Sequence, residues 1–292
     1  MGLIVLPPLS QLEVVGTTPG RGFMSLYPYA RHLIAGTYGP MPVQSYASDG
    51  ISWHEMPSGA LATVGESLFA MTRFSKDGQL YGATESTGKT VRFALDGWHV
   101  VFQAPGGWNN SYSVVDYGGV LVTGFNVYPD NDRSLLAWST DGVTWAHHTI
   151  LGMHHPRFTT DGTNLFIAWP NLHGEVEVWD QGLRQIMAVP GTFVGQPYWW
   201  RGGGSGNGAL FLAVETGEGE PCRVYRNGQH VASLDGQQVG SQFLAHENEL
   251  WLASLTKWRG TGNGALWASP DGLTWTRRVT LPEPEGWCLA QY

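Results

Sequence analysis

Two loop-like segments and one short run combine aromatic rings with side chains that form directional hydrogen bonds. The segments span residues 124–133 and 255–264, and the run spans residues 108–110. A ring offers a flat apolar platform, while Asn, Asp and Arg beside it fix the orientation of a ligand, as in sugar or peptide sites. The candidate ligand-binding residues are Trp108, Asn110, Tyr128, Asp130, Asp132, Arg133, Trp258 and Arg259. The alternative for the two tryptophans is a structural role, as wedges between neighbouring units of the fold.

The histidines and acidic residues do not form a metal-ligand pattern. His154 and His155 are adjacent, but no carboxylate or Cys follows them at ligand spacing. The run 130–132 offers oxygen ligands and lacks the rest of a calcium loop. The sequence therefore predicts no metal ion, no cofactor and no catalytic group.

Composition excludes several classes of protein. The chain of 292 residues has 16 Lys and Arg against 24 Asp and Glu, a net charge of −8, and only 14% of its residues are charged. A nucleic-acid-binding protein needs a basic face, so no nucleic-acid partner is expected. No apolar run could span a bilayer and the N-terminus has no signal-peptide pattern, so we expect a soluble protein made in the cytoplasm, without membrane insertion. The two cysteines, Cys222 and Cys288, are expected to be free thiols.

An internal repeat organises the chain. Short apolar runs start at residues 33, 80, 120, 165, 210 and 250, so their separations are 47, 40, 45, 45 and 40 residues. Turn residues, mostly Asp-Gly or Asn-Gly, form a second ladder at 49, 96, 141, 180, 227 and 271. Two ladders with one period near 44 residues indicate a repeat architecture.

Each repeat has the features of one β-propeller blade. The apolar runs are short and bounded by Gly, Asn, Asp or Pro, which predicts strands and almost no helix. Four short antiparallel strands fit a repeat of this size. We therefore predict an all-β propeller and a single domain, residues 1–292. Its repeat units are 21–57, 58–104, 105–149, 150–190, 191–235 and 236–281.

The chain ends resemble parts of a further blade. Residues 12–20 are in phase with the outer strand at 98–106, and residues 284–287 match the entry to an inner strand at 105–108. We therefore expect seven blades, the last built from 1–20 and 282–292, with residues 287–292 as its inner strand. Closing the ring in this way would hide sheet edges. The alternative is six blades with the tails packed as extra strands.

The turn ladder carries a resemblance to a known superfamily. Residues 269–275 (SPDGLTW) and 139–145 (STDGVTW) are near copies, 47–53 (ASDGISW) is a third, and 94–98 (ALDGW) is a degraded fourth. These segments resemble the Asp boxes, or BNR repeats, of sialidase-like propellers, in a variant that is one residue shorter. The resemblance implies structural roles for Asp49, Asp96, Asp141, Asp271, Trp53, Trp145 and Trp275.

The sialidase catalytic signature is not recognisable in this chain. Sialidases carry an arginine triad, a Tyr with a Glu partner and an Asp acid, and the first arginine lies in a Phe/Tyr-Arg-Ile-Pro motif. The nearest composition here, residues 155–158 (HPRF), has the wrong order. We therefore expect a non-catalytic structural or adhesion module, with assembly subunits or a surface glycan as partners, incorporated into a virion such as a tailed-phage tail or fibre. The alternative is a lectin or a sialidase-like glycoside hydrolase.

Overall fold

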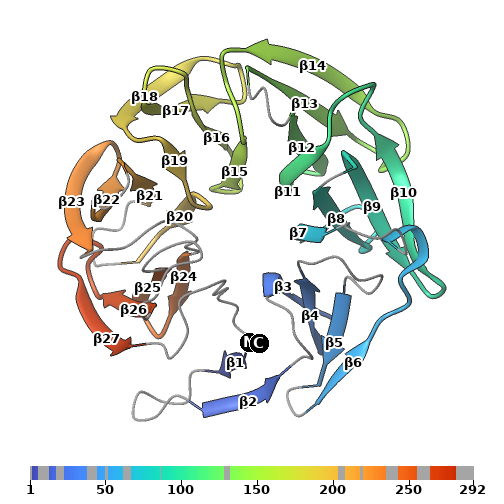
Figure 1. Ribbon diagram of the computed structural model, residues 1–292, viewed down its shortest axis with the longest axis horizontal. Helices are drawn as coiled ribbons and strands as arrows, with labels where there is room; N and C mark the ends of the chain where they lie inside the picture. The colour runs from blue at the N-terminus through green and yellow to red at the C-terminus, as the bar shows by residue number, and fades with distance from the viewer. Residues whose placement is uncertain are drawn as a thin grey trace.

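The computed structural model describes residues 2–5, 13–17, 23–37, 45–49, 52–61, 67–85, 87–127, 132–202, 208–217, 220–234, 243–254 and 264–280. These residues form six antiparallel sheets arranged radially about one axis, and a two-stranded sheet (Figure 1). The all-β propeller predicted from the repeat is therefore confirmed.

Each of the six larger sheets is one blade, and its strands follow one another in sequence from the axis outward. Blades one to three comprise β3 (Phe23–Tyr29), β4 (His32–Thr37), β5 (Ser45–Ser48), β6 (Trp53–Glu55); β7 (Ser67–Arg73), β8 (Leu80–Glu85), β9 (Lys89–Ala94), β10 (Gly97–Gln103); and β11 (Asn110–Tyr117), β12 (Val120–Asn126), β13 (Arg133–Ser139), β14 (Ala146–Leu151). Blades four to six comprise β15 (Arg157–Thr160), β16 (Leu165–Pro170), β17 (Glu175–Asp180), β18 (Gln185–Pro190); β19 (Phe193–Val194), β20 (Tyr198–Trp200), β21 (Ala209–Glu215), β22 (Cys222–Arg226), β23 (Gln229–Leu234); and β24 (Phe243–His246), β25 (Glu249–Ser254), β26 (Ala265–Ser269), β27 (Thr276–Thr280). The fifth blade has five strands because its inner strand is split into β19 and β20, which both pair with β21.

The second strand of each blade is the most deeply buried. Every residue of β16 is buried, whereas the outer strand β14 is almost entirely exposed. Both faces of a second strand are covered because a neighbouring blade packs on each side, which explains the continuous apolar runs in the sequence. Apolar clusters fill the interfaces between successive blades from the first to the sixth.

Inner strands of neighbouring blades are also joined by hydrogen bonds. The Ser25 hydroxyl donates to the Leu68 carbonyl over 2.9 Å. The Phe158 amide donates to the Ser113 hydroxyl over 3.1 Å. The Ala245 amide donates to the Tyr198 hydroxyl over 3.3 Å. These bonds fix the relative positions of blades near the axis.

The ring differs from the main expectation in its number of blades. The described residues form six blades, which matches the six-blade alternative and not the seven-blade prediction. Where a seventh four-stranded blade was expected, β1 (Gly2–Val5) pairs only with β2 (Glu13–Thr17). Figure 1 shows this sheet between the first and sixth blades. The strand β2 pairs with the strand that precedes it in the sequence. The predicted inner strand at 287–292 lies outside the described residues.

The antiparallel order gives each blade two ends with different connections. Connections from the first to the second strand and from the third to the fourth lie at one end, here called the lower end. Connections from the second to the third strand, and from the fourth to the next blade, lie at the upper end. Among the described residues, the helical structure is one short turn, η1 (Gly59–Leu61), and no helix is long and apolar enough to span a membrane.

Candidate functional site

Half of the sequence-predicted ligand-binding residues lie outside the described residues, namely Tyr128, Asp130, Trp258 and Arg259. The other four lie at the upper end of the third blade. Trp108 and Asn110 are buried, with exposures of 9% and 6%, and the Trp108 ring belongs to an apolar cluster with Phe125.

Two charged candidates lie beside the Trp108 ring. The Arg133 guanidinium lies over this ring, 5.5 Å from its centroid, and its Nε is 3.7 Å from Asp132 Oδ1. Both charged side chains are about half exposed, so their ion pair contributes little to stability. The structure therefore places Arg133, which is paired with an exposed Asp132, over an indole that belongs to the core.

The Asp-box-like turns lie at the lower end, where the third and fourth strands connect. Asp141 Oδ1 accepts hydrogen bonds from the backbone amides of Val143 and Thr144 at 2.8 and 2.7 Å. Asp271 Oδ1 accepts from the equivalent amides, both at 2.8 Å. These backbone hydrogen bonds stabilise the carboxylate and lower the pKa of Asp141 to about 2.

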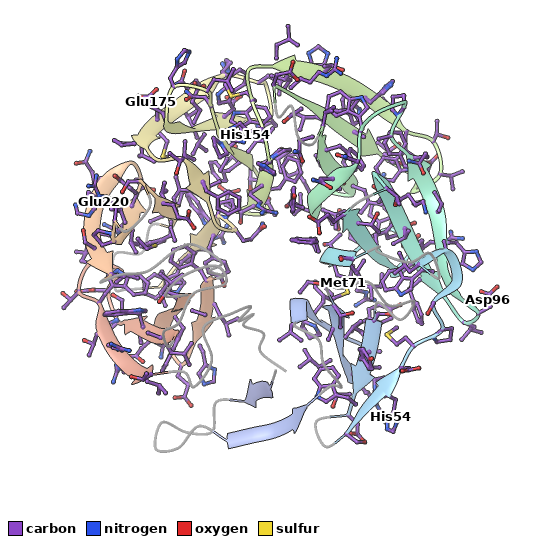
Figure 2. All side chains as sticks on the ribbon, in the orientation of Figure 1. His54, Met71, Asp96, His154, Glu175 and Glu220 are labelled. Carbon is purple, nitrogen blue, oxygen red and sulfur yellow. The ribbon has the colours of Figure 1, made fainter. Side chains whose placement is uncertain are left out.

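The other two aspartates differ in their partners. Asp49 Oδ1 accepts from the Ser52 amide at 3.2 Å. Asp96 Oδ1 instead lies 2.8 Å from Nε2 of His99, whose hydrogen bond lowers the pKa of Asp96. Figure 2 shows Asp96 at the outer rim of the ring.

The tryptophans that follow the turns lie against neighbouring rings. Trp145 packs on Phe102 of the preceding blade, with ring centroids 5.3 Å apart. Trp275 lies 6.1 Å from Phe243 of its own blade. Trp53, on the outer strand of the first blade, is partly buried.

A second polar cluster lies at the upper end, where blades two, three and four meet near the axis. It comprises Glu85, Tyr112, His154, His155 and Arg157, and we call it the Arg157 cluster. Glu85 ends β8, Tyr112 lies near the start of β11, and Arg157 starts β15. Because second strands end and inner strands begin at the upper end, the topology brings these residues together. Figure 2 shows His154 closer to the axis than Glu175 of the same blade.

Arg157 is the centre of this cluster. Its side chain is buried, and Nη1 donates to the Tyr112 carbonyl over 2.8 Å. The guanidinium carbon lies 4.6 Å from the centroid of the Tyr112 ring and 5.6 Å from that of Phe193, so the cation stacks between two aromatic rings. Burial lowers the pKa of Arg157 to about 10, which leaves the group charged at neutral pH.

The Tyr112 hydroxyl connects this cation to a carboxylate. It donates to Glu85 Oε1 over 3.3 Å, and the edge of its ring meets Phe69 with centroids 4.9 Å apart. Burial raises the pKa of Glu85, and the Tyr112 hydrogen bond and the Arg157 charge oppose this effect. The cluster therefore holds one buried cation and one largely buried carboxyl group on the same tyrosine.

The two histidines complete the cluster as neutral groups. The His155 ring lies 4.8 Å from Tyr112 and 5.9 Å from Phe193 between centroids. Burial, with smaller contributions from Arg157 and His154, lowers the pKa of His155 to about 3. Burial also lowers the pKa of His154. At neutral pH both imidazoles are therefore uncharged.

Four buried atoms in this cluster have no hydrogen-bond partner among the described residues. They are Oε2 of Glu85, Nδ1 of His154, Nδ1 of His155 and Nε of Arg157. A buried polar atom without a partner costs about 1–3 kcal/mol, and a charged group costs more. Such atoms gathered at one place are suited to a polar ligand that supplies the missing partners.

The sequence signal for this cluster was weak. His154, His155 and Arg157 stand in one short segment, but Tyr112 and Glu85 lie 45 and 72 residues before Arg157 and carry no motif. A metal centre is not indicated within the described parts of the chain, because they contain no group of three or more His, Cys, Asp or Glu side chains placed to hold an ion. Cys222 is a buried free thiol, and Cys288 lies outside the described residues.

Comparisons with known proteins support the fold and give no information about the Arg157 cluster. No family model matches the chain, and no curated protein matches it. A crystal structure of BBS1N in complex with ARL6DN is similar over 80% of this chain and 74% of its own, with 13% identity and a TM-score of 0.54. The computationally designed Ika8 protein is similar over 88% and 87%, with 10% identity and a TM-score of 0.50. At these identities the likeness concerns the fold alone, and the chain is similar to other β-propellers.

Proposed function

We propose that this chain is a non-catalytic binding module that takes a polar ligand at the Arg157 cluster. The single observation that supports the proposal is the group of four buried, partnerless polar atoms at the upper end of three adjacent blades. If this region served only stability, pairing these groups or replacing them by apolar side chains would make the fold more stable. Glu85 and Arg157 belong to strands of the ring, which hold these two groups in fixed positions as a binding site requires.

The setting that we propose is an assembly, in which the propeller contacts other subunits or a surface glycan. Low charge together with abundant Gly and Trp supports a virion component such as a tail or fibre protein, by analogy at the level of the fold. Two equivalent turns, at Asp141 and Asp271, support a relationship with Asp-box propellers as part of the same proposal. Locating the chain in purified particles by electron microscopy tests the virion setting.

One observation favours a second candidate, a sialidase-like glycoside hydrolase. Tyr112 donates to Glu85, and a Tyr with a Glu partner belongs to the sialidase constellation. The described residues bring one arginine, Arg157, to this pair, so the support for an arginine triad is missing there. Hydrolysis of a fluorogenic glycoside that is lost in Tyr112→Phe would favour this candidate over the binding module.

A ligand screen tests the binding module directly. Wild type and Arg157→Gln are compared by thermal shift against polar metabolites and by binding to a glycan array. We expect at least one ligand that binds wild type, is not turned over, and binds Arg157→Gln at least tenfold more weakly, since a charged hydrogen bond is lost. Arg184→Gln is the matched control, because this arginine is 82% exposed and lies at the lower end. The proposal fails if every ligand binds both variants equally.

A further inference from the structure

The charges of the Arg157 cluster restrict what can bind there. Arg157 is positive, Glu85 is the acidic group, and both histidines are neutral at neutral pH because burial lowers the pKa of each. With Glu85 ionised, the cluster has no net charge. A ligand with a net charge would therefore leave one buried charge without compensation, which is costly in a desolvated site.

The partnerless atoms at these two charges have opposite requirements. Nε of Arg157 is a donor without an acceptor, and Oε2 of Glu85 is an acceptor without a donor. Each group has one bond to Tyr112, through the backbone carbonyl for Arg157 and through the hydroxyl for Glu85. The missing partners are thus an anion on the arginine side and a donor, best a cation, on the carboxylate side.

The two charges are also close enough for one small molecule. The Arg157 guanidinium carbon is 4.6 Å from the Tyr112 ring centroid, and Glu85 is 3.3 Å from the hydroxyl of the same ring. Phe69 packs on this tyrosine and Phe193 on the guanidinium, so the tyrosine that joins the two charges lies among aromatic rings. Desolvation of this kind strengthens the attraction between a bound ion and its counterion.

We infer that the Arg157 cluster binds a zwitterion of the amino-acid type, with the ligand's carboxylate on Arg157 and its ammonium group on Glu85. The inference rests on the proposed binding function and specifies its ligand class. No covalent step is involved. A zwitterion supplies both missing partners and keeps the site neutral.

Four small probes test separately the contributions of the carboxylate and of the ammonium group to binding. Glycine carries both charges, acetate only the anion and methylammonium only the cation, while glycolate replaces the ammonium by a hydroxyl. Affinity is measured by isothermal titration calorimetry at pH 7 and constant ionic strength. We expect glycine to bind at least tenfold more tightly than each of the other three. Acetate or glycolate binding as tightly as glycine overturns the inference.

Two carboxylate variants test the role of Glu85. Glu85→Gln can keep the Tyr112 hydrogen bond, but its amide cannot neutralise an ammonium group, so we expect glycine to bind about tenfold more weakly. Acetate should bind more tightly than to wild type, because it then neutralises Arg157 and leaves no other buried charge. Glu175→Gln makes the same change at an exposed position of the upper end and should leave both affinities unchanged. If Glu85→Gln fails to fold, Glu85→Ala tests the same loss of the negative charge, and the same decrease in glycine affinity is expected.

The outcomes distinguish this inference from the proposed function. If glycine affinity does not change in Glu85→Gln, or if no zwitterion binds, the inference is overturned. A metabolite or glycan that still depends on Arg157 would then leave the binding function standing. If no ligand depends on Arg157, both fail.

Discussion

At the residue scale, Glu85 is a buried acidic group whose ionisation lowers the stability of the fold. Its carboxyl group is largely buried, and Oε2 has no hydrogen-bond partner among the described residues. Because burial raises the pKa of Glu85 above its value in the unfolded chain, the folded state binds the proton more tightly. Stability from this group is therefore greatest below the unfolded pKa and is lost as pH rises through the folded value.

Replacing Glu85 should consequently stabilise the protein at neutral pH. Glu85→Gln removes the ionised form and can keep the hydrogen bond with Tyr112. We expect a gain of about 1 kcal/mol at pH 7, since the penalty for a partnerless buried group falls in that range. Urea unfolding at pH 7 and pH 4 measures the effect, which should shrink at pH 4. Equal or lower stability of the variant at pH 7 would contradict this account.

The contribution of His155 to stability changes with pH in the opposite direction from that of Glu85. Burial lowers the pKa of this imidazole to about 3, below the ordinary value of 6.5. As pH falls below 6.5, His155 becomes protonated in the unfolded chain but stays neutral in the folded chain. The free energy of unfolding therefore decreases down to about pH 3. The residue also adopts a left-handed backbone, with φ of 50°.

Asn is the suitable replacement, because it tolerates left-handed φ better than most residues and does not titrate. We expect His155→Asn to be less stable than wild type at pH 7, because ring contacts with Tyr112 and Phe193 are lost. The difference should narrow as pH falls from 6.5 toward 3. Chemical unfolding across this pH range provides the measurement, and a difference that stays constant would show that His155 is not buried as a neutral group.

At the scale of elements, two of the lower turns pack closely against the blade before them. A Cβ on Gly142 would lie 2.2 Å from the Tyr81 hydroxyl oxygen, and a Cβ on Gly272 would lie 2.4 Å from the Phe211 ring. Tyr81 and Phe211 occupy the same place in the second strands of the preceding blades. The two turns therefore dock in equivalent ways at two different interfaces.

Gly142→Ala tests this docking. The substitution adds a clash with Tyr81 to the strain of a left-handed residue at φ of 75°. Gly152→Ala is the control, since Gly152 has φ of 74° and nothing within 4 Å of its added Cβ. We expect Gly142→Ala to cost about 1–3 kcal/mol more than Gly152→Ala, the usual cost of overpacking. Similar losses in the two variants would mean that the turn does not pack tightly on Tyr81.

The elements were predictable from the sequence to a much greater extent than the Arg157 cluster. The runs at residues 80 and 210 repeat with one period because each second strand is packed between two blades, so the constraint is local and regular. The bond between Tyr112 and Glu85, by contrast, joins residues 27 apart, and neither belongs to a motif. Whether a polar atom is buried without a partner depends on three blades together, which no short pattern encodes.

Closure of the ring is the property that belongs to the whole molecule. Apolar clusters couple successive blades from the first to the sixth, as in repeat proteins whose units stabilise their neighbours. The first and sixth blades have a second neighbour, the β1–β2 sheet, which Figure 1 shows between them. We therefore expect this sheet to support the two blades at the ends of the row.

Deleting residues 1–17 should therefore destabilise the two blades beside the gap more than those opposite it. We expect amide hydrogen exchange to become at least tenfold faster in β25 of the sixth blade, and to change little in β12 and β16, because local opening follows the loss of neighbouring packing. Insertion of two glycines between Gly106 and Gly107, which are exposed, is the control for a change in chain length and should leave all three strands protected. Exchange is followed by mass spectrometry of peptides from each blade. Uniform acceleration in every blade would show that the ring unfolds only as a whole, and unchanged exchange in β25 would show that the β1–β2 sheet does not support its neighbours.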